Sequence, residues 1–134
     1  MTEKHINQLF FEARRLWLFG WFLLKDTKAC LADCNGTGAD WMPKFIRRFL
    51  DFILRLFAPA VAIHDRRYSK NKGDRNKWDD EFETNCRIIA RHKYGKFNPL
   101  RYLAYRVAHK LRIALTITGE IAWIQAGKEN HVNS

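Results

Sequence analysis

The stretch APAVAIHDRRY, residues 58–68, decides how this chain of 134 residues is interpreted. Small and apolar residues lead into His64 and Asp65, and Tyr68 follows one helical turn after His64. The apolar lead predicts that this turn is largely buried. Burying an imidazole and a carboxylate without partners costs free energy. These side chains therefore either satisfy one another and a nearby group, or they carry out chemistry.

A second acidic segment, Trp78–Phe82, supplies a candidate partner for His64. Asp74 is placed to cap a helix that continues to Tyr94, and Gly95 is placed to stop it. Helical periodicity puts Asp79 on the apolar face of this helix and Asp80 on the polar face. The apolar stripe continues from Asp79 through Phe82, Cys86 and Ile89. We therefore expect Asp79 to point inward, although a rotated helix would present Asp80 instead.

Apolar periodicity over most of the chain predicts an all-α fold, without a convincing strand. The fold is expected to be a compact helical domain built around two packed helices, one with His64, Asp65 and Tyr68 and one with Asp79. Additional helices are expected near both ends, and Gly119 either ends or weakens the last one. The expected helices cover residues 2–20, 43–57, 59–70, 74–94 and from Pro99 onward, with a loop over 25–41. One domain, residues 1–127, and a flexible tail, 128–134, are expected.

Aromatic residues interrupt the first helical pattern. Trp17, Phe19, Trp21 and Phe22 stand in a segment that is apolar all round. We interpret this segment first as part of the core. The alternative is an exposed patch at a membrane interface, where aromatic rings are enriched.

The composition favours an anionic partner. Lys and Arg number 24 against 14 Asp and Glu, which gives a net charge of +10. Together with five Trp and ten Phe, this charge favours an anionic phospholipid surface over nucleic acid. Three cysteines do not make a disulfide framework, which fits a reducing compartment. No signal peptide or transmembrane segment is expected, so the expected location is cytoplasmic or virion-associated, peripheral to a membrane.

The motif His64-Asp65-x-x-Tyr68 resembles the catalytic helix of the phospholipase A2 family. Upstream, Cys34-Asn35-Gly36-Thr37-Gly38 is similar to the Gly-x-Gly calcium loop of that family. Downstream, Asp79-x-x-Phe82 is similar to the element that follows in its viral and phage-encoded branch, which includes the parvoviral capsid phospholipase domain. The resemblance spans residues 34–86 in the family's order, and it implies a viral or phage protein of lipid degradation.

The resemblance implies a hydrolase that cleaves the sn-2 ester of phospholipids. His64 would act as general base toward water, a task that suits an imidazole because its ordinary pKa lies near working pH. Asp79 would accept a hydrogen bond from the other ring nitrogen and so orient the ring. Tyr68 would donate a hydrogen bond to the same carboxylate.

The resemblance also implies Ca²⁺ as cofactor. Asp65 would bind the ion together with backbone carbonyls of Asn35 or Cys34, and of Gly36 and Gly38. Because Ca²⁺ takes about six to eight oxygen ligands, water or substrate must complete the shell. The chain departs from the secreted enzymes in lacking their flanking cysteines and in its long interval between Gly38 and His64.

The sequence is also compatible with functions that involve no catalysis. His64, Asp65 and Tyr68 could form a polar cluster that only satisfies itself, and the glycine loop could be an ordinary turn. A non-catalytic basic helical module that binds membrane or protein would keep the same fold. A nucleic-acid-binding helical protein would account for the charge, but the sequence has no recognised binding motif.

Overall fold

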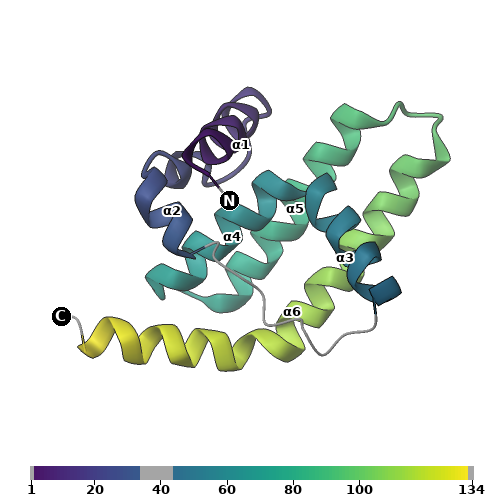
Figure 1. The fold of residues 1–134 in the computed structure, drawn as a ribbon. Coiled ribbons are helices and arrows are strands. Elements are labelled where there is room, and N and C mark those ends of the chain that lie inside the picture. Colours follow the sequence, from purple (N-terminus) through teal and green to yellow (C-terminus); the bar gives the residue numbers. More distant parts are fainter. Residues whose placement is uncertain (1, 34–43, 133–134) are drawn as a thin grey trace.

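The computed structural model describes residues 2–33 and 44–132, which form six α-helices and one short 3-10 helix, with no strand in those ranges (Figure 1). The all-α prediction is confirmed. In chain order the elements are α1 (Glu3–Arg15), η1 (Trp21–Leu24), α2 (Thr27–Asp33), α3 (Lys44–Leu56), α4 (Ala58–Lys70), α5 (Arg75–Lys93) and α6 (Pro99–Val132). In Figure 1, α4 and α5 lie in the middle, α1 and α2 lie on one side, and the long α6 runs along the other.

The hairpin of α4 and α5 forms because the sequence ends one helix and starts the next within a few residues. α4 ends at Asn71, whose left-handed φ of 51° lets its N–H bond the carbonyls of Arg67 and Tyr68. Gly73 turns the chain with a φ of 83°. The side chain of Asp74 then caps α5 by accepting a hydrogen bond from the N–H of Asn76 at 3.0 Å. The hairpin therefore packs the turn with His64 against the first turns of α5.

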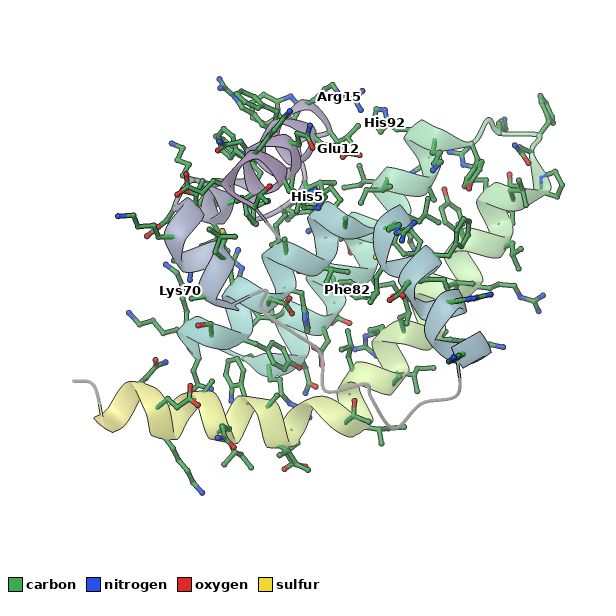
Figure 2. The ribbon with its side chains drawn as sticks, viewed as in Figure 1. His5, Glu12, Arg15, Lys70, Phe82 and His92 are labelled. Atoms are coloured by element: carbon green, nitrogen blue, oxygen red, sulfur yellow. The ribbon has the colours of Figure 1, made fainter. Side chains whose placement is uncertain are left out.

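The core is a continuous apolar cluster between α1, η1, α4 and α5. Phe82, labelled in Figure 2, is buried in it. Cys30 and Cys86 are buried in the same cluster. Other buried members are Ile6, Leu9, Ala13, Leu16, Leu18, Phe57, Ile63 and Ile89.

Part of the predicted loop over 25–41 is helical. α2 begins after Asp26, whose carboxylate accepts a hydrogen bond from the N–H of Ala29 at 3.1 Å. This is a side-chain cap of the kind that starts helices, and Asp26 is the sequence signal that marks it. The glycine loop at 34–38 lies outside the described residues.

α6 continues as one helix through Gly119 and Gly127, so Gly119 does not end it. Both glycines let α6 approach α4 closely: a Cβ would lie 2.8 Å from the Tyr68 hydroxyl at Gly119 and 2.9 Å from the Asn71 side chain at Gly127. Asn130 also donates to the carbonyl of Ser69 at 2.9 Å. The predicted tail from residue 128 therefore differs from the structure, in which residues 128–132 are helical. Tertiary contacts outweigh the low helix propensity of glycine here.

The core interpretation of the aromatic segment is correct for its leucines and wrong for most of its aromatic residues. Leu16, Leu18, Leu23 and Leu24 are buried, whereas Trp17, Phe19 and Phe22 are exposed. None of the helices in residues 2–33 and 44–132 combines the length and the apolar character that crossing a bilayer requires.

Asn85 fixes the segment between α1 and η1 to α5. Its side chain is fully buried, accepts a hydrogen bond from the N–H of Phe19 and donates one to the carbonyl of Phe19, each at 2.9 Å. Asn85→Ala leaves both backbone groups without these partners, so the free energy of unfolding should fall by about 2–4 kcal/mol. Urea denaturation measures this loss.

The matched control is Asn7→Ala, because Asn7 is exposed on α1. That change should alter the free energy of unfolding by less than about 0.5 kcal/mol. Equal stability of Asn85→Ala and the unchanged protein would contradict the role of Asn85.

Candidate active site

The candidate site is centred on a buried pair formed by His64 of α4 and Asp79 of α5. His64 Nε2 lies 2.9 Å from Asp79 Oδ1. The side chains are 6% and 0% exposed, respectively. The sequence placed Asp79 on the inner face of α5, and the structure places it against His64.

Tyr68 and Thr116 complete the surroundings of the Asp79 carboxylate. Tyr68 stands one helical turn after His64 on the same face of α4, and its hydroxyl donates to Asp79 Oδ1 at 2.7 Å. The Thr116 hydroxyl of α6 lies 3.5 Å from Asp79 Oδ2. Phe82 packs against the His64 ring, with 5.3 Å between ring centroids. Three helices therefore meet at one carboxylate.

The hydrogen bonds determine the charge of Asp79. Burial, the largest effect, would raise the pKa of this carboxyl group. Hydrogen bonds from His64 and Tyr68, together with the charges of His64 and Arg75, outweigh burial and hold the pKa below its ordinary value. Burial, followed by the hydrogen bond to Asp79 and its negative charge, raises the pKa of Tyr68. Asp79 is thus an ionised acceptor and Tyr68 a neutral donor at neutral pH.

This charge state fixes the tautomer of His64. An ionised carboxylate can only accept hydrogen bonds, so Nε2 of His64 must carry the proton that faces Asp79. In a neutral ring, Nδ1 then holds a lone pair and can accept a proton. Nδ1 makes no hydrogen bond to any residue that the structure describes.

The His64 side chain forms part of the wall of a cavity of about 1070 Å³. The cavity lies between α4 and α6, and α2 contributes Ala32 to its wall. Further wall residues are Asp65, Tyr68, Ser69, Leu115, Thr118, Gly119 and Ala122. A ligand or a water molecule in this cavity can therefore reach the imidazole that Asp79 orients.

The two adjacent acidic residues of α5 have different roles. Asp79 is buried against His64, whereas Asp80 is exposed and forms an ion pair with Arg112 of α6. His64 therefore pairs with Asp79 and not with Asp80.

The predicted calcium ligands are only partly described. The half-buried Asp65 brings carboxylate oxygens, which are hard donors that Ca²⁺ prefers, to the cavity wall beside His64. Asn35, Gly36 and Gly38 lie outside the described residues. Ala32, near the end of α2, lines the same cavity. Within residues 2–33 and 44–132 no three His, Cys, Asp or Glu side chains gather for a metal. Among the described residues that line the cavity near His64, Asp65 is the carboxylate next to His64 in the sequence that could contribute to such a site.

The sequence did not indicate Arg75, Thr116 and Gly119 as parts of the site. Arg75 Nη1 donates to the Thr116 carbonyl at 3.2 Å and links the start of α5 to α6. Gly119 leaves room for the Tyr68 hydroxyl. The available signal was a glycine within an apolar helical pattern, which can mark a close approach as well as a helix end.

The contribution of Asp79 to the free energy of unfolding should depend on pH. The pKa of Asp79 is lowered on folding, so Asp79 stabilises the fold above its unfolded pKa of about 4. That stability is lost as the pH falls through the folded pKa. Tyr68→Phe removes one hydrogen bond that lowers the pKa, so it should reduce the free energy of unfolding by about 1–3 kcal/mol at neutral pH. The difference between the two proteins should narrow as the pH falls below about 4.

Urea denaturation at a series of pH values measures this difference. A gap between Tyr68→Phe and the unchanged protein that stays constant from neutral to acidic pH would show that the hydroxyl does not act through Asp79.

The second prediction concerns Gly119. In Gly119→Ala the new Cβ would lie 2.8 Å from the Tyr68 hydroxyl oxygen and 3.1 Å from Cε2 of the same ring. The overpacking should lower the free energy of unfolding by about 1–3 kcal/mol, although alanine is the better helix former. Gly95→Ala is the control, because no atom lies within 4 Å of its added Cβ. Thermal unfolding compares the two variants, and a more stable Gly119→Ala would contradict the close approach.

No protein-family model, curated protein or solved structure matches this chain. The similarity of His64-Asp65-x-x-Tyr68 to the phospholipase A2 family therefore stays a prediction from the motif.

Proposed function

We propose that the protein is a calcium-dependent phospholipase A2-like hydrolase that cleaves the sn-2 ester of membrane phospholipids. The observation that carries the proposal is the buried His64–Asp79 pair, in which His64 also lines a cavity. Buried polar side-chain atoms usually have a hydrogen-bond partner in the protein or in ordered water. Here one nitrogen is bonded to Asp79 and the other has no partner among the described residues.

In the proposed mechanism, His64 Nδ1 takes a proton from a water molecule in the cavity while the water oxygen attacks the ester carbonyl carbon. The resulting imidazolium is stabilised by the Asp79 carboxylate, whose position the Tyr68 hydroxyl fixes. Collapse of the tetrahedral intermediate breaks the bond between the acyl carbon and the glycerol oxygen. His64 returns its proton to that oxygen, so the products are a fatty acid and a lysophospholipid.

Asp65 and the carbonyls of Asn35, Gly36 and Gly38 would hold the calcium ion. When bound, Ca²⁺ supplies positive charge that stabilises the oxyanion and the substrate phosphate. The support for this part is the placement of Asp65 beside His64 and of Ala32 on the same cavity wall. The proposal includes the expected location at a membrane surface, in a cell or a virion of viral or phage origin.

Two further functions are kept as alternatives. A non-catalytic module would keep the helical fold and bind membrane or another protein through its basic surface. A nucleic-acid-binding protein would use the net charge of +10 against phosphates. The oriented imidazole beside a cavity favours hydrolysis over both, because neither alternative needs a base.

Hydrolysis of phosphatidylcholine vesicles, followed by release of fatty acid, tests the proposal. His64→Ala should lower the rate by about 100- to 10,000-fold, since the general base is lost. Asp79→Asn should also lower the rate strongly, because its amide can donate a hydrogen bond and no longer fixes the tautomer of His64. Asp80→Asn is the matched control on the next residue of α5, and its rate should be close to that of the unchanged protein.

Calcium is tested in the same assay. Chelation should abolish hydrolysis, and Asp65→Asn should raise the calcium concentration needed for half-maximal rate. Hydrolysis that is indifferent to both chelation and His64→Ala would refute the proposal. Vesicle binding without hydrolysis in the unchanged protein would support the non-catalytic module, and DNA binding with a steep salt dependence would support the nucleic-acid alternative.

A further inference from the structure

Helix α1 ends in a backbone motif that usually contains glycine. The N–H of Leu18 bonds the carbonyl of Ala13 at 3.0 Å, and the N–H of Trp17 bonds the carbonyl of Arg14 at 3.1 Å. This pair of bonds defines a Schellman motif, with Trp17 at the position that requires a left-handed backbone. Trp17 has a φ of 54°. A residue with a Cβ is strained in that region, and glycine is not.

Packing offsets little of this strain. The Trp17 side chain is 71% exposed. Its ring meets the edge of Trp21, with 6.2 Å between ring centroids. Residues with a strained backbone cluster at sites where a protein binds a partner or carries out a reaction. The exposed indole therefore points to a binding role for this corner of the molecule.

Trp17 belongs to an exposed aromatic platform, which we define as Phe11, Trp17, Phe19 and Phe22. The other three members are 65%, 58% and 51% exposed, respectively. Trp17 and Phe22 each contact the Trp21 ring, and Phe11 contacts Phe10, which also contacts Trp21. Phe19 lies between Trp17 and Phe22 in the sequence. Exposed aromatic residues close to one another mark interaction sites. Arg15, labelled in Figure 2, stands at the end of α1.

The core holds the platform rigidly. Buried Asn85 bonds both backbone groups of Phe19. Gly20 turns the chain with a φ of 82°, and its position lies so close to Ile63 that a Cβ would be 2.9 Å from the Ile63 Cγ2 atom. The exposed rings are therefore presented by fixed backbone, which lowers the entropy cost of binding.

The charges around the platform are mostly positive. Arg14 and Lys25 lie over the Trp21 ring, with 5.7 Å and 5.5 Å to its centroid. Between Phe11 and Lys28 the chain carries the cations Arg14, Arg15, Lys25 and Lys28 against the acids Glu12 and Asp26. Aromatic rings beside lysine and arginine complement a phospholipid surface, where rings enter the interface and cations meet anionic headgroups.

We propose that the aromatic platform docks on an anionic phospholipid surface. The proposal deepens the proposed function by naming the surface that meets the lipid. The docking itself does not require hydrolysis, so it is measured in the His64→Ala protein as well as in the unchanged chain.

Co-sedimentation with vesicles tests the proposal. The probes are vesicles of phosphatidylcholine alone and vesicles of phosphatidylcholine and phosphatidylglycerol in equal parts. The unchanged protein and His64→Ala should bind the anionic vesicles more tightly than the neutral ones. Trp17→Gly should weaken this binding about tenfold, because the apolar area that enters the interface is lost. Thermal unfolding of Trp17→Gly should occur at the same or a higher temperature, because glycine relieves the strain.

Vesicle binding is also measured for a control variant and for a second platform variant. Phe97→Ala is the matched control, since Phe97 is 94% exposed between α5 and α6, outside the platform, and it should bind vesicles like the unchanged protein. Phe19→Ala is the second platform variant, and it should weaken binding too. The proposal is overturned if both platform variants bind anionic vesicles normally, or if Phe97→Ala weakens binding equally. Binding of DNA or protein without binding of anionic vesicles would also overturn it.

Discussion

The ionised carboxylate of Asp79 is the constraint on which the rest of the structure depends. A buried charge is tolerated only when hydrogen-bond donors surround it. The donors are His64 and Tyr68 on α4, while Asp79 itself belongs to α5. The Thr116 hydroxyl of α6, which also donates to the carbonyl of Arg112 at 3.0 Å, lies 3.5 Å from the carboxylate. The same contacts tie three helices together and fix the tautomer of His64. Stability and the proposed chemistry therefore depend on the same few atoms, and a chain that misplaced any of the three helices would lose both.

The hairpin of α4 and α5 could be read from the sequence because its signals are local. Asp74 caps α5 through its own side chain, and Gly73 and Asn71 occupy left-handed positions at the turn. Helical periodicity alone separated Asp79 from Asp80, because neighbouring helical residues point about 100° apart. His64 and Asp79 lie on the inner faces of two helices. A short turn joins these helices and brings the two side chains together.

Other features could not be read from the sequence, because tertiary contacts decide them. Gly119 and Gly127 have low helix propensity, yet α6 continues through both because Tyr68 and Asn71 occupy the space that a side chain would need. Trp17 stands in an apolar segment of the sequence, which suggests burial. The backbone motif at the end of α1 instead leaves its side chain exposed. Thr116 has no local pattern that marks it as a neighbour of Asp79. For the glycines and for Thr116, the deciding atoms are distant in the sequence.

The order of the helices along the chain has a consequence for protein synthesis. Asp79 and His64 leave the ribosome before Thr116 and Gly119, because α6 follows α5. A nascent chain that ends before Thr116 lacks the α6 wall of the cavity and the hydroxyl beside Asp79 Oδ2. Translation therefore delivers the imidazole and its carboxylate first and the enclosing wall afterwards. The site reaches its finished form only once the polypeptide has been elongated well past α5.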